Sequence, residues 1–357
     1  MNDAFDVVEG DVLVRDGRIV SVGPAVERAD RVIDARGGYL LPGFIQTHIH
    51  LCQTLFRGYA DDLALLDWLK TRVWPMEAAH TPRSLAAAAQ QAAAELLRSG
   101  TTTVLTMETV HDTDAVFDAL EPMGLRAVVG KCMMDADAAV PRRLMEQIAL
   151  IKARTGRRNI DYLADTGLAS PHLCLAHCVW VDESEQALMA ERDVKVLHCP
   201  GSNLKLGSGL APVVEMRAKG ISVSLGADGA ACNNHLDMFE EMRLAAVLQS
   251  VRHRPGALTA RDALWMATRE GALALGLEAE IGSVEPGKRA DLIVVDASGP
   301  DPYSTLVYAS RGTDVRTTIV DGEVLVDNFE APRWDTDAIA RAARQEAQAL
   351  AARAGLF

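Results

Sequence analysis

The sequence lacks the features of a membrane protein, a secreted protein and a nucleic-acid-binding protein. None of its apolar runs is as long as a membrane span must be. The N-terminus, MNDAFDVVEG, has no apolar core and no cleavage-site pattern, so we expect no signal peptide. Lysines and arginines are spread among more numerous acids, with a formal net charge of −13, whereas a phosphate-binding surface needs clustered basic residues. We therefore expect a cytoplasmic protein that has neither a membrane nor a nucleic acid as partner.

Cysteines are few and carry no metal-binding pattern. The six cysteines are scattered without a Cys-x-x-Cys pair. In a chain of this size without a secretion signal, they are expected to be reduced thiols. Cys174 and Cys178 stand close enough to suggest a metal site, but their position on an apolar strand favours packing instead.

The sequence has instead two β-rich ends around a middle in which apolar strands alternate with amphipathic helices. Short β-runs and the turn signals Asp16-Gly17 and Asp321-Gly322 mark the two ends. In the middle, strand candidates are followed by helical stretches such as SLAAAAQQAAAELLRSG, and this alternation implies an α/β fold of parallel strands with right-handed crossovers. The expected domains are a composite β-sandwich (1–37 and 278–330), a (β/α) barrel (38–277) and a C-terminal helix (331–357).

The barrel is expected to be incomplete. The strand candidates are LPGFIQTHI, TTTVLTME, RAVVGKCM, LCLAHCV, VKVLHC and ISVSLGAD, so about two strand units are missing from the usual eight. The shortfall lies between Met134 and Leu173, where the sequence is helical and contains no strand candidate. Because a barrel cannot close without these strands, and open parallel edges invite pairing with another chain, we expect an open or distorted barrel and a homo-oligomer.

Polar residues stand at the C-terminal ends of these strands, where a (β/α) barrel has its active site. His48 and His50 are two positions apart on one strand, so both imidazoles face the same point and form a partial ligand set for Zn²⁺ or Fe²⁺. A His-x-His pair alone is more often incidental, but this pair ends an apolar strand. Asp228, before Gly229, can bind a metal, act as a base or simply make a turn. His177, taken alone, is equally consistent with a buried structural histidine.

Several segments together resemble the amidohydrolase superfamily. They are LLPGFIQTHIHLCQTLFRGYADDLALLDWL, SGTTTVL, LAHCVW, HCPGSNLKLGSGLAPV, SLGADGAACNNHLDMFEEMRLA and IGSVEPGKRADLIVVD. The resemblance extends over nearly the whole chain. The most similar branch contains the methylthioadenosine/S-adenosylhomocysteine deaminases and the triazine chlorohydrolase and deaminase group. The resemblance implies a TIM-type (β/α)8 metallo-hydrolase barrel and a small heterocyclic substrate.

The resemblance also implies a mononuclear metal site. His48 and His50 match the family's first-strand ligands, and Asp228 matches its last-strand ligand and proton shuttle. His177 matches a histidine beside the metal that helps to polarise the bound water or the substrate. One divalent ion, Zn²⁺ with Fe²⁺ as the alternative, is therefore the expected cofactor.

Two further residues are expected to contact the substrate. Glu77 matches an acid of the family that faces the ribose hydroxyls in nucleoside deaminases. Trp68 is expected to line the same pocket.

The sequence departs from the family in one motif. The family carries a His-x-x-Glu on a middle strand, which supplies another metal ligand and a proton-shuttling glutamate, but none of the nine histidines here has Glu three positions later. The missing motif coincides with the missing strands, so one internal deletion explains both. Two residues at strand ends are hypothetical substitutes, Glu108 as acid or base and His198 as a spare ligand, each weighed against an ordinary polar role.

These features lead to two functional hypotheses. The first is a metal-dependent hydrolytic deaminase of an amino-purine, a nucleoside or a related nitrogen heterocycle, in which activated water attacks a ring carbon and ammonia leaves. A triazine-type chlorohydrolase is its nearest chemical variant, because only the leaving group differs. The second hypothesis is a catalytically impaired or dead relative that retains part of the ligand set.

Overall fold

The strands expected in the middle of the chain are all present in the structure, a computed structural model that describes residues 2, 4–24, 28–133 and 152–356. They are β4 (Phe44–His50), β5 (Thr101–Met107), β6 (Arg126–Gly130), β7 (Cys174–Ala176), β8 (Lys195–His198), β9 (Val223–Leu225) and β10 (Asp228–Gly229). Only Gly226 and Ala227 separate β9 from β10, so these two short strands occupy one strand position. β9 pairs with β8, and β10 pairs with β4, both in parallel.

These strands form an open arc in the part of the chain that the structure describes. One parallel sheet has the order β10-β4-β5-β6 and the other has the order β7-β8-β9. No pairing joins β6 to β7 among the described residues, which agrees with the expected open barrel. Part of the stretch predicted to be helical, residues 134–151, lies outside the described residues. Residues 152–173 contain α6 (Asn159–Asp165) and no strand, as predicted. The homo-oligomer stays a prediction.

Helices cover the arc and bury its apolar residues. The alanine-rich stretch predicted to be helical is α3 (Pro82–Arg98), which begins with a capping box between Thr81 and Ser84 and is followed by Gly100 in the left-handed conformation. On the other half of the arc, Val196 and Leu225 share an apolar cluster with Phe239 of α10 (Met238–Arg252). The remaining helices of this layer are α4 (Asp114–Leu120), α7 (Glu183–Glu191), α9 (Val213–Ala218), α11 (Ala260–Ala267) and α12 (Arg269–Ala274).

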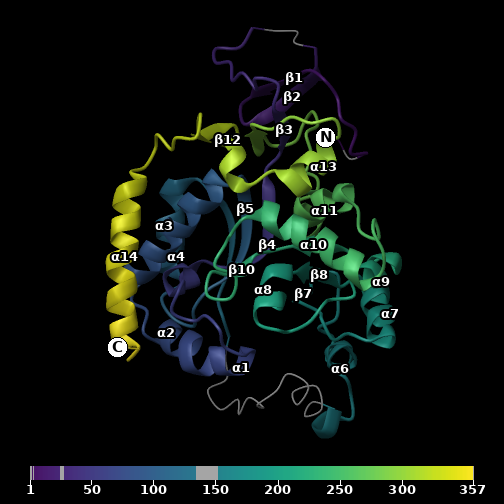
Figure 1. Ribbon diagram of the computed structural model, residues 1–357, viewed down its shortest axis with the longest axis vertical. Helices are drawn as coiled ribbons and strands as arrows, with labels where there is room; N and C mark the ends of the chain where they lie inside the picture. Colours follow the sequence, from purple (N-terminus) through teal and green to yellow (C-terminus); the bar gives the residue numbers. More distant parts are fainter. Residues whose placement is uncertain (1, 3, 25–27, 134–151, 357) are drawn as a thin grey trace.

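A second, mostly antiparallel body combines strands from both ends of the chain. Its sheet has the order β13-β12-β11-β3, with β3 (Tyr39–Pro42), β11 (Leu292–Val295), β12 (Val315–Val320) and β13 (Glu323–Val326). The hairpin of β1 (Asp11–Arg15) and β2 (Arg18–Gly23) lies at the same end of the molecule (Figure 1). Both predicted Asp-Gly turns form hairpins with left-handed backbone at Asp and Gly. β3 lies just beyond the predicted domain boundary at residue 37, and the domain division itself stays a prediction.

The C-terminal helix α14 (Thr336–Arg353) runs along one side of the molecule and packs on α3 (Figure 1). Two short helices follow barrel strands: η1 (Leu51–Phe56) follows β4, and α8 (Pro200–Lys205) follows β8. Two more, α1 (Leu65–Trp68) and α2 (Trp74–Ala78), lie between η1 and α3 in the sequence. Among the described helices, none combines the length and the apolar character that crossing a membrane requires.

Candidate metal centre

Strand β4 carries the two histidines of the His-x-His pair, and its surroundings fix their orientation. The Nδ1 atom of His50 lies 2.7 Å from the carbonyl oxygen of Met107, so Nδ1 carries the hydrogen and Nε2 faces Asp228. The imidazoles of His48 and His50 are 4.9 Å apart between ring centroids and nearly perpendicular. Both side chains are largely buried, as expected for residues that face the interior of the arc.

Glu108 anchors the backbone directly after this pair. Its two carboxylate oxygens accept hydrogen bonds from the backbone N–H groups of Leu51 (3.1 Å) and Cys52 (2.9 Å), which open η1. The hydroxyl of Thr106 donates to the same carboxylate. Since both oxygens already have partners and the side chain is 2% exposed, the geometry favours an anchoring role for Glu108 over the hypothetical role as acid or base.

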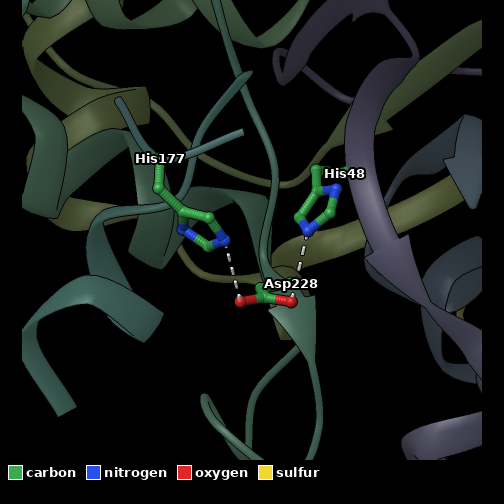
Figure 2. A group of neighbouring side chains, drawn as sticks. All are labelled: His48, His177 and Asp228. Carbon is green, nitrogen blue, oxygen red and sulfur yellow. Dashed lines mark ion pairs between the residues drawn. The ribbon is translucent and has the colours of Figure 1, made fainter. Parts of the chain in front are cut away.

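Asp228 lies at the centre of three histidines. Its Oδ1 atom is 3.5 Å from Nε2 of His48 and 3.2 Å from Nε2 of His50, and its Oδ2 atom is 3.8 Å from Nε2 of His177. Figure 2 shows His48 and His177 pointing at the carboxylate from opposite sides. The residues that the sequence placed at three different strand ends therefore meet at one point.

The structure gives His177 a more central position than we expected. The ligand atoms of His48, His177 and Asp228 all lie within 4.8 Å of one another, which is a donor set that could hold a metal ion. His50 lies nearest to the same carboxylate, at 3.2 Å, but does not belong to this group of ligand atoms. The Nδ1 atom of His177 lies 2.9 Å from Oδ1 of Asn203, so it is the hydrogen-bond donor and Nε2 faces Asp228.

The backbone around the site is strained at His177 and Asp228. His177 has φ 68° and Asp228 has φ 64°, a left-handed conformation that residues other than glycine adopt infrequently and that recurs at functional sites. Gly226 allows β9 to pass close to His48, since a Cβ at Gly226 would lie 2.5 Å from the carbonyl oxygen of His48. The strain directs the two side chains toward each other across the end of the arc.

The electrostatics of the centre favour an ionised Asp228. Burial opposes the charged form of Asp228, but the hydrogen bonds to His48 and His50 outweigh it and hold the pKa of this carboxyl well below its usual range. Burial likewise opposes the charged form of His50, but the hydrogen bond and the charge of Asp228 raise the pKa of His50 to about 9. Burial lowers the pKa of His48 despite the same partner. The centre is thus a carboxylate that attracts cations, which suits a divalent metal.

Ser202 and Asn203 hydrogen-bond to Asp228 and His177, and sequence analysis did not single out either residue. The hydroxyl of Ser202 donates to Oδ2 of Asp228 at 2.6 Å, and Asn203 accepts from His177 as described above. Both belong to α8, in the segment HCPGSNLKLGSGLAPV that carried part of the family resemblance. Their polar side chains directly after a barrel strand were the only available signal.

The predicted substrate-contacting residues lie in different surroundings. Glu77, on α2, accepts a hydrogen bond at 2.9 Å from the amide of Gln53, and burial raises the pKa of its carboxyl. Its charge also acts on His50, which places it near the centre. Trp68, at the end of α1, is 5% exposed and packs in an apolar cluster with Leu55 and Phe56. The contacts of both residues with a substrate stay predictions.

His198, the hypothetical spare ligand, is fully buried at the end of β8. Neither ring nitrogen has a hydrogen-bond partner among the described residues, and burial, with a contribution from His177, lowers its pKa to about 3. Its ring does not join the group of ligand atoms that lie within 4.8 Å of one another. The structure thus brings His177, rather than His198, to the group of residues that could hold a metal ion.

Comparison with known proteins agrees with this architecture and with the missing segment. The amidohydrolase family matches the chain in two segments, residues 39–158 and 148–325, which meet in the region between β6 and β7. The 5'-deoxyadenosine deaminase of Methanosarcina acetivorans is 37% identical, over 99% of this chain and 96% of its own length. That alignment spans 418 positions, more than the 357 residues of this chain, so the relative contains residues that have no counterpart here.

Two other proteins extend the comparison. The 5-methylthioadenosine/S-adenosylhomocysteine deaminase of Halobacterium salinarum is 38% identical, over 98% of this chain and 96% of its own length. The crystal structure of an adenosine deaminase from Xanthomonas campestris with bound zinc superimposes with a TM-score of 0.87 and 32% identity, covering 95% of this chain and 93% of the other. Together with the family match over most of the sequence, these similarities show that the chain belongs to the amidohydrolase family.

Proposed function

We propose that this chain is a metal-dependent hydrolase that deaminates a purine nucleoside of the adenosine type. The observation that carries the proposal is the convergence of three imidazole nitrogens on the buried carboxylate of Asp228. The relatives named for deamination of 5'-deoxyadenosine, methylthioadenosine and S-adenosylhomocysteine, and the structure of an adenosine deaminase, support the substrate class.

The residues present fit a divalent cation. Imidazole and carboxylate are the ligand types of catalytic zinc sites, and the hydrogen bonds at Nδ1 of His50 and His177 leave their Nε2 atoms free for a metal. We assign the metal to His48, His50 and Asp228, with His177 beside it. We propose Zn²⁺, in agreement with the zinc in the adenosine deaminase structure, and keep Fe²⁺ as the alternative. When bound, such a metal lowers the pKa of a water and so makes a nucleophile available at neutral pH.

The chain's own residues would then bind the substrate and move protons. Asp228 is ionised because its pKa lies well below the usual range, so it can accept a proton from the attacking water and return it to the leaving nitrogen. Nε2 of His177 has no hydrogen when Nδ1 donates to Asn203, so it is placed to accept a hydrogen bond from the amino group of the purine. Glu77 would accept hydrogen bonds from the sugar hydroxyls, which requires its ionised form despite the raised pKa.

The experiment also has to distinguish the proposed deaminase from two alternative functions. One of them follows from the absence of a His-x-x-Glu motif in the sequence. A catalytically impaired relative would keep the metal and lose turnover. A triazine-type chlorohydrolase would release chloride instead of ammonia. Neither alternative changes the fold or the ligand set.

The test combines metal content with product release. Purified full-length chain is analysed by elemental mass spectrometry, and ammonia release is measured with adenosine, 5'-deoxyadenosine, methylthioadenosine, guanine and melamine, and chloride release with atrazine. We expect about one zinc per chain and ammonia from the adenosine analogues. Both should be lost in the double variant of His48→Ala and His50→Ala. Metal-loaded, folded protein without any turnover would support the impaired relative, and absence of metal from the unmodified chain would refute the proposal.

A further inference from the structure

Helix α8 connects two separate residues of the metal centre. Its consecutive residues Ser202 and Asn203 bond Oδ2 of Asp228 at 2.6 Å and Nδ1 of His177 at 2.9 Å. Asp228 comes from β10 and His177 from the end of β7, on opposite sides of β8. The position of α8 therefore sets the distance and the angle between the carboxylate and this imidazole.

Helix α8 cannot hold that position by itself. It is six residues long, and its N-cap residue, Cys199, makes no side-chain capping bond. A helix this short has little stability of its own in water, so its place depends on contacts with the rest of the fold. One contact lies at its C-terminal end, where Nζ of Lys205 bonds Oδ1 of Asp61 at 2.5 Å and the carbonyl oxygen of Ala231 at 3.4 Å.

The contact at the N-terminal end of α8 is the carboxyl group of Glu241, from α10. Oε2 of Glu241 accepts a hydrogen bond from the backbone N–H of Gly201 at 3.1 Å. Oε1 accepts another from the amide of Asn233 at 2.8 Å, and that amide also donates to the carbonyl oxygen of Ala227 at 2.7 Å. Glu241 thus joins α8 to the backbone on either side of Asp228. Gly201 must be glycine for this approach, because a Cβ there would lie 2.5 Å from Oε1 of Glu241.

Burying the carboxyl group of Glu241 costs free energy that filling the same space with an apolar side chain would not. It is 1% exposed, and burial, with contributions from the charges of Glu240 and Asp228, raises the pKa of its carboxyl to about 8. An apolar side chain of similar volume would fill the same space without the desolvation penalty. Directional hydrogen bonds to two separate segments are what the carboxyl provides and an apolar side chain does not.

We propose that Glu241 is a positioning residue of the metal centre. By holding Gly201 and Asn233, it fixes α8 relative to β10, so that Ser202 holds the ligand Asp228 in place and Asn203 holds His177 beside the metal. This inference rests on the proposed function in that the centre holds a metal ion.

The experiment compares three variants of the full chain. Glu241→Ala removes both hydrogen bonds. Glu241→Gln keeps an acceptor for the N–H of Gly201 but sets an amide NH₂ against the amide of Asn233. The control is Gln249→Ala, because Gln249 lies on the same helix, is also 1% exposed and bonds the carbonyl oxygen of Ala211, away from the centre. Zn²⁺ affinity is measured by competition with a chromophoric chelator, and the tautomer of His177 is measured by NMR of metal-free protein labelled with ¹⁵N-histidine.

We expect Glu241→Ala to weaken Zn²⁺ binding by roughly ten- to a hundredfold, the range typical for residues that orient metal ligands. His177 should change from the single Nδ1–H tautomer to a mixture of both tautomers. The Zn²⁺ affinity and the His177 tautomer of Glu241→Gln should lie between those of Glu241→Ala and those of the unmodified chain. This variant decides the outcome if the alanine variant does not fold. Gln249→Ala should match the unmodified chain in both measurements, although its thermal stability falls.

Unchanged affinity and an unchanged His177 tautomer in both Glu241 variants would overturn the proposal. An equal loss of affinity in Gln249→Ala would also overturn it, because general destabilisation would then explain the effect. If the unmodified chain does not bind Zn²⁺, the proposed function fails. The tautomer comparison in the metal-free protein still decides the role of Glu241 in that case.

Discussion

Replacing Gly226 by alanine tests whether the close passage of β9 past β4 sets the geometry of the metal centre. The new Cβ would lie 2.5 Å from the carbonyl oxygen and 2.7 Å from the backbone nitrogen of His48. Restoring an ordinary contact of 3.4 Å requires a separation of roughly 0.9 Å, whereas metal–ligand distances tolerate only about 0.2 Å. Since the obstacle is backbone on both sides, the movement has to displace His48 itself.

We expect Gly226→Ala to lower the free energy of unfolding by about 1–3 kcal/mol, as overpacking of a filled interior does. For a chain of this length, that corresponds to a fall in Tm of about 1–4 °C. Zn²⁺ affinity should fall by at least about tenfold, because the same movement displaces a ligand. The assay is chelator competition for affinity and differential scanning calorimetry for Tm.

The control for this variant is Gly256→Ala. Gly256 has φ +75°, and a Cβ added there would have no atom within 4 Å, so alanine at this position costs on the order of 1–2 kcal/mol through backbone strain alone. It should lower Tm comparably and leave Zn²⁺ affinity unchanged. A folded Gly226→Ala variant that binds Zn²⁺ as tightly as the unmodified chain would refute the reasoning.

Three other perturbations have predictable results. Glu108→Gln should lower the free energy of unfolding by about 2–3 kcal/mol in urea, because an amide replaces a carboxylate that accepts two backbone N–H groups, and unchanged stability would contradict the anchoring role. Burial lowers the pKa of His80 to about 4, against about 6.5 unfolded, so its contribution to stability is complete above pH 6.5 and decreases by about 2 kcal/mol as the pH falls to 5. His80→Asn should flatten this dependence in urea unfolding at pH 7 and 5, and an equal slope in both proteins would count against it. A chelator should lower the Tm of the zinc-loaded chain and abolish ammonia release, both reversed by added Zn²⁺, whereas His48→Ala should be insensitive to the chelator.

The parallel strands and the meeting of His48, His50 and Asp228 could be predicted from the sequence because they depend on repeating local patterns. Each barrel strand is a short apolar run that ends in a polar residue, so His48, His50 and Asp228 could be placed at one end of a parallel sheet before the fold was known. A gap between β6 and β7 was predicted because that stretch has no strand pattern, and the described residues show no pairing between these two strands. The two hairpin turns could be predicted directly from their Asp-Gly sequences, because both residues accept the left-handed backbone that these hairpins need.

Other features depend on tertiary contacts that leave no pattern in the sequence. The position of His177 beside Asp228 depends on a left-handed backbone at the end of β7, and histidine adopts this conformation too rarely for the sequence to place it there. Glu108 ends a strand like a catalytic residue, yet it caps the backbone that follows a neighbouring strand. Glu241 lies on α10 in the acidic sequence MFEEMRLA, where nothing distinguishes it from the Glu240 before it, and only the packing of α10 buries one of the two.

The open arc keeps the residues of the candidate metal centre together, although its strands form no closed ring in the described part of the chain. The residues that could hold a metal ion come from β4, β10 and the end of β7, which all lie within the run β7, β8, β9/β10 and β4, and β5 and β6 extend the arc beyond β4. The junction between β6 and β7 is therefore a place where strand units can be removed, or inserted by design, without altering the spacing of the ligands. Grafting the corresponding segment of a deaminase into that junction would add the family's His-x-x-Glu motif to the centre, and so would test whether a further ligand and a glutamate raise turnover.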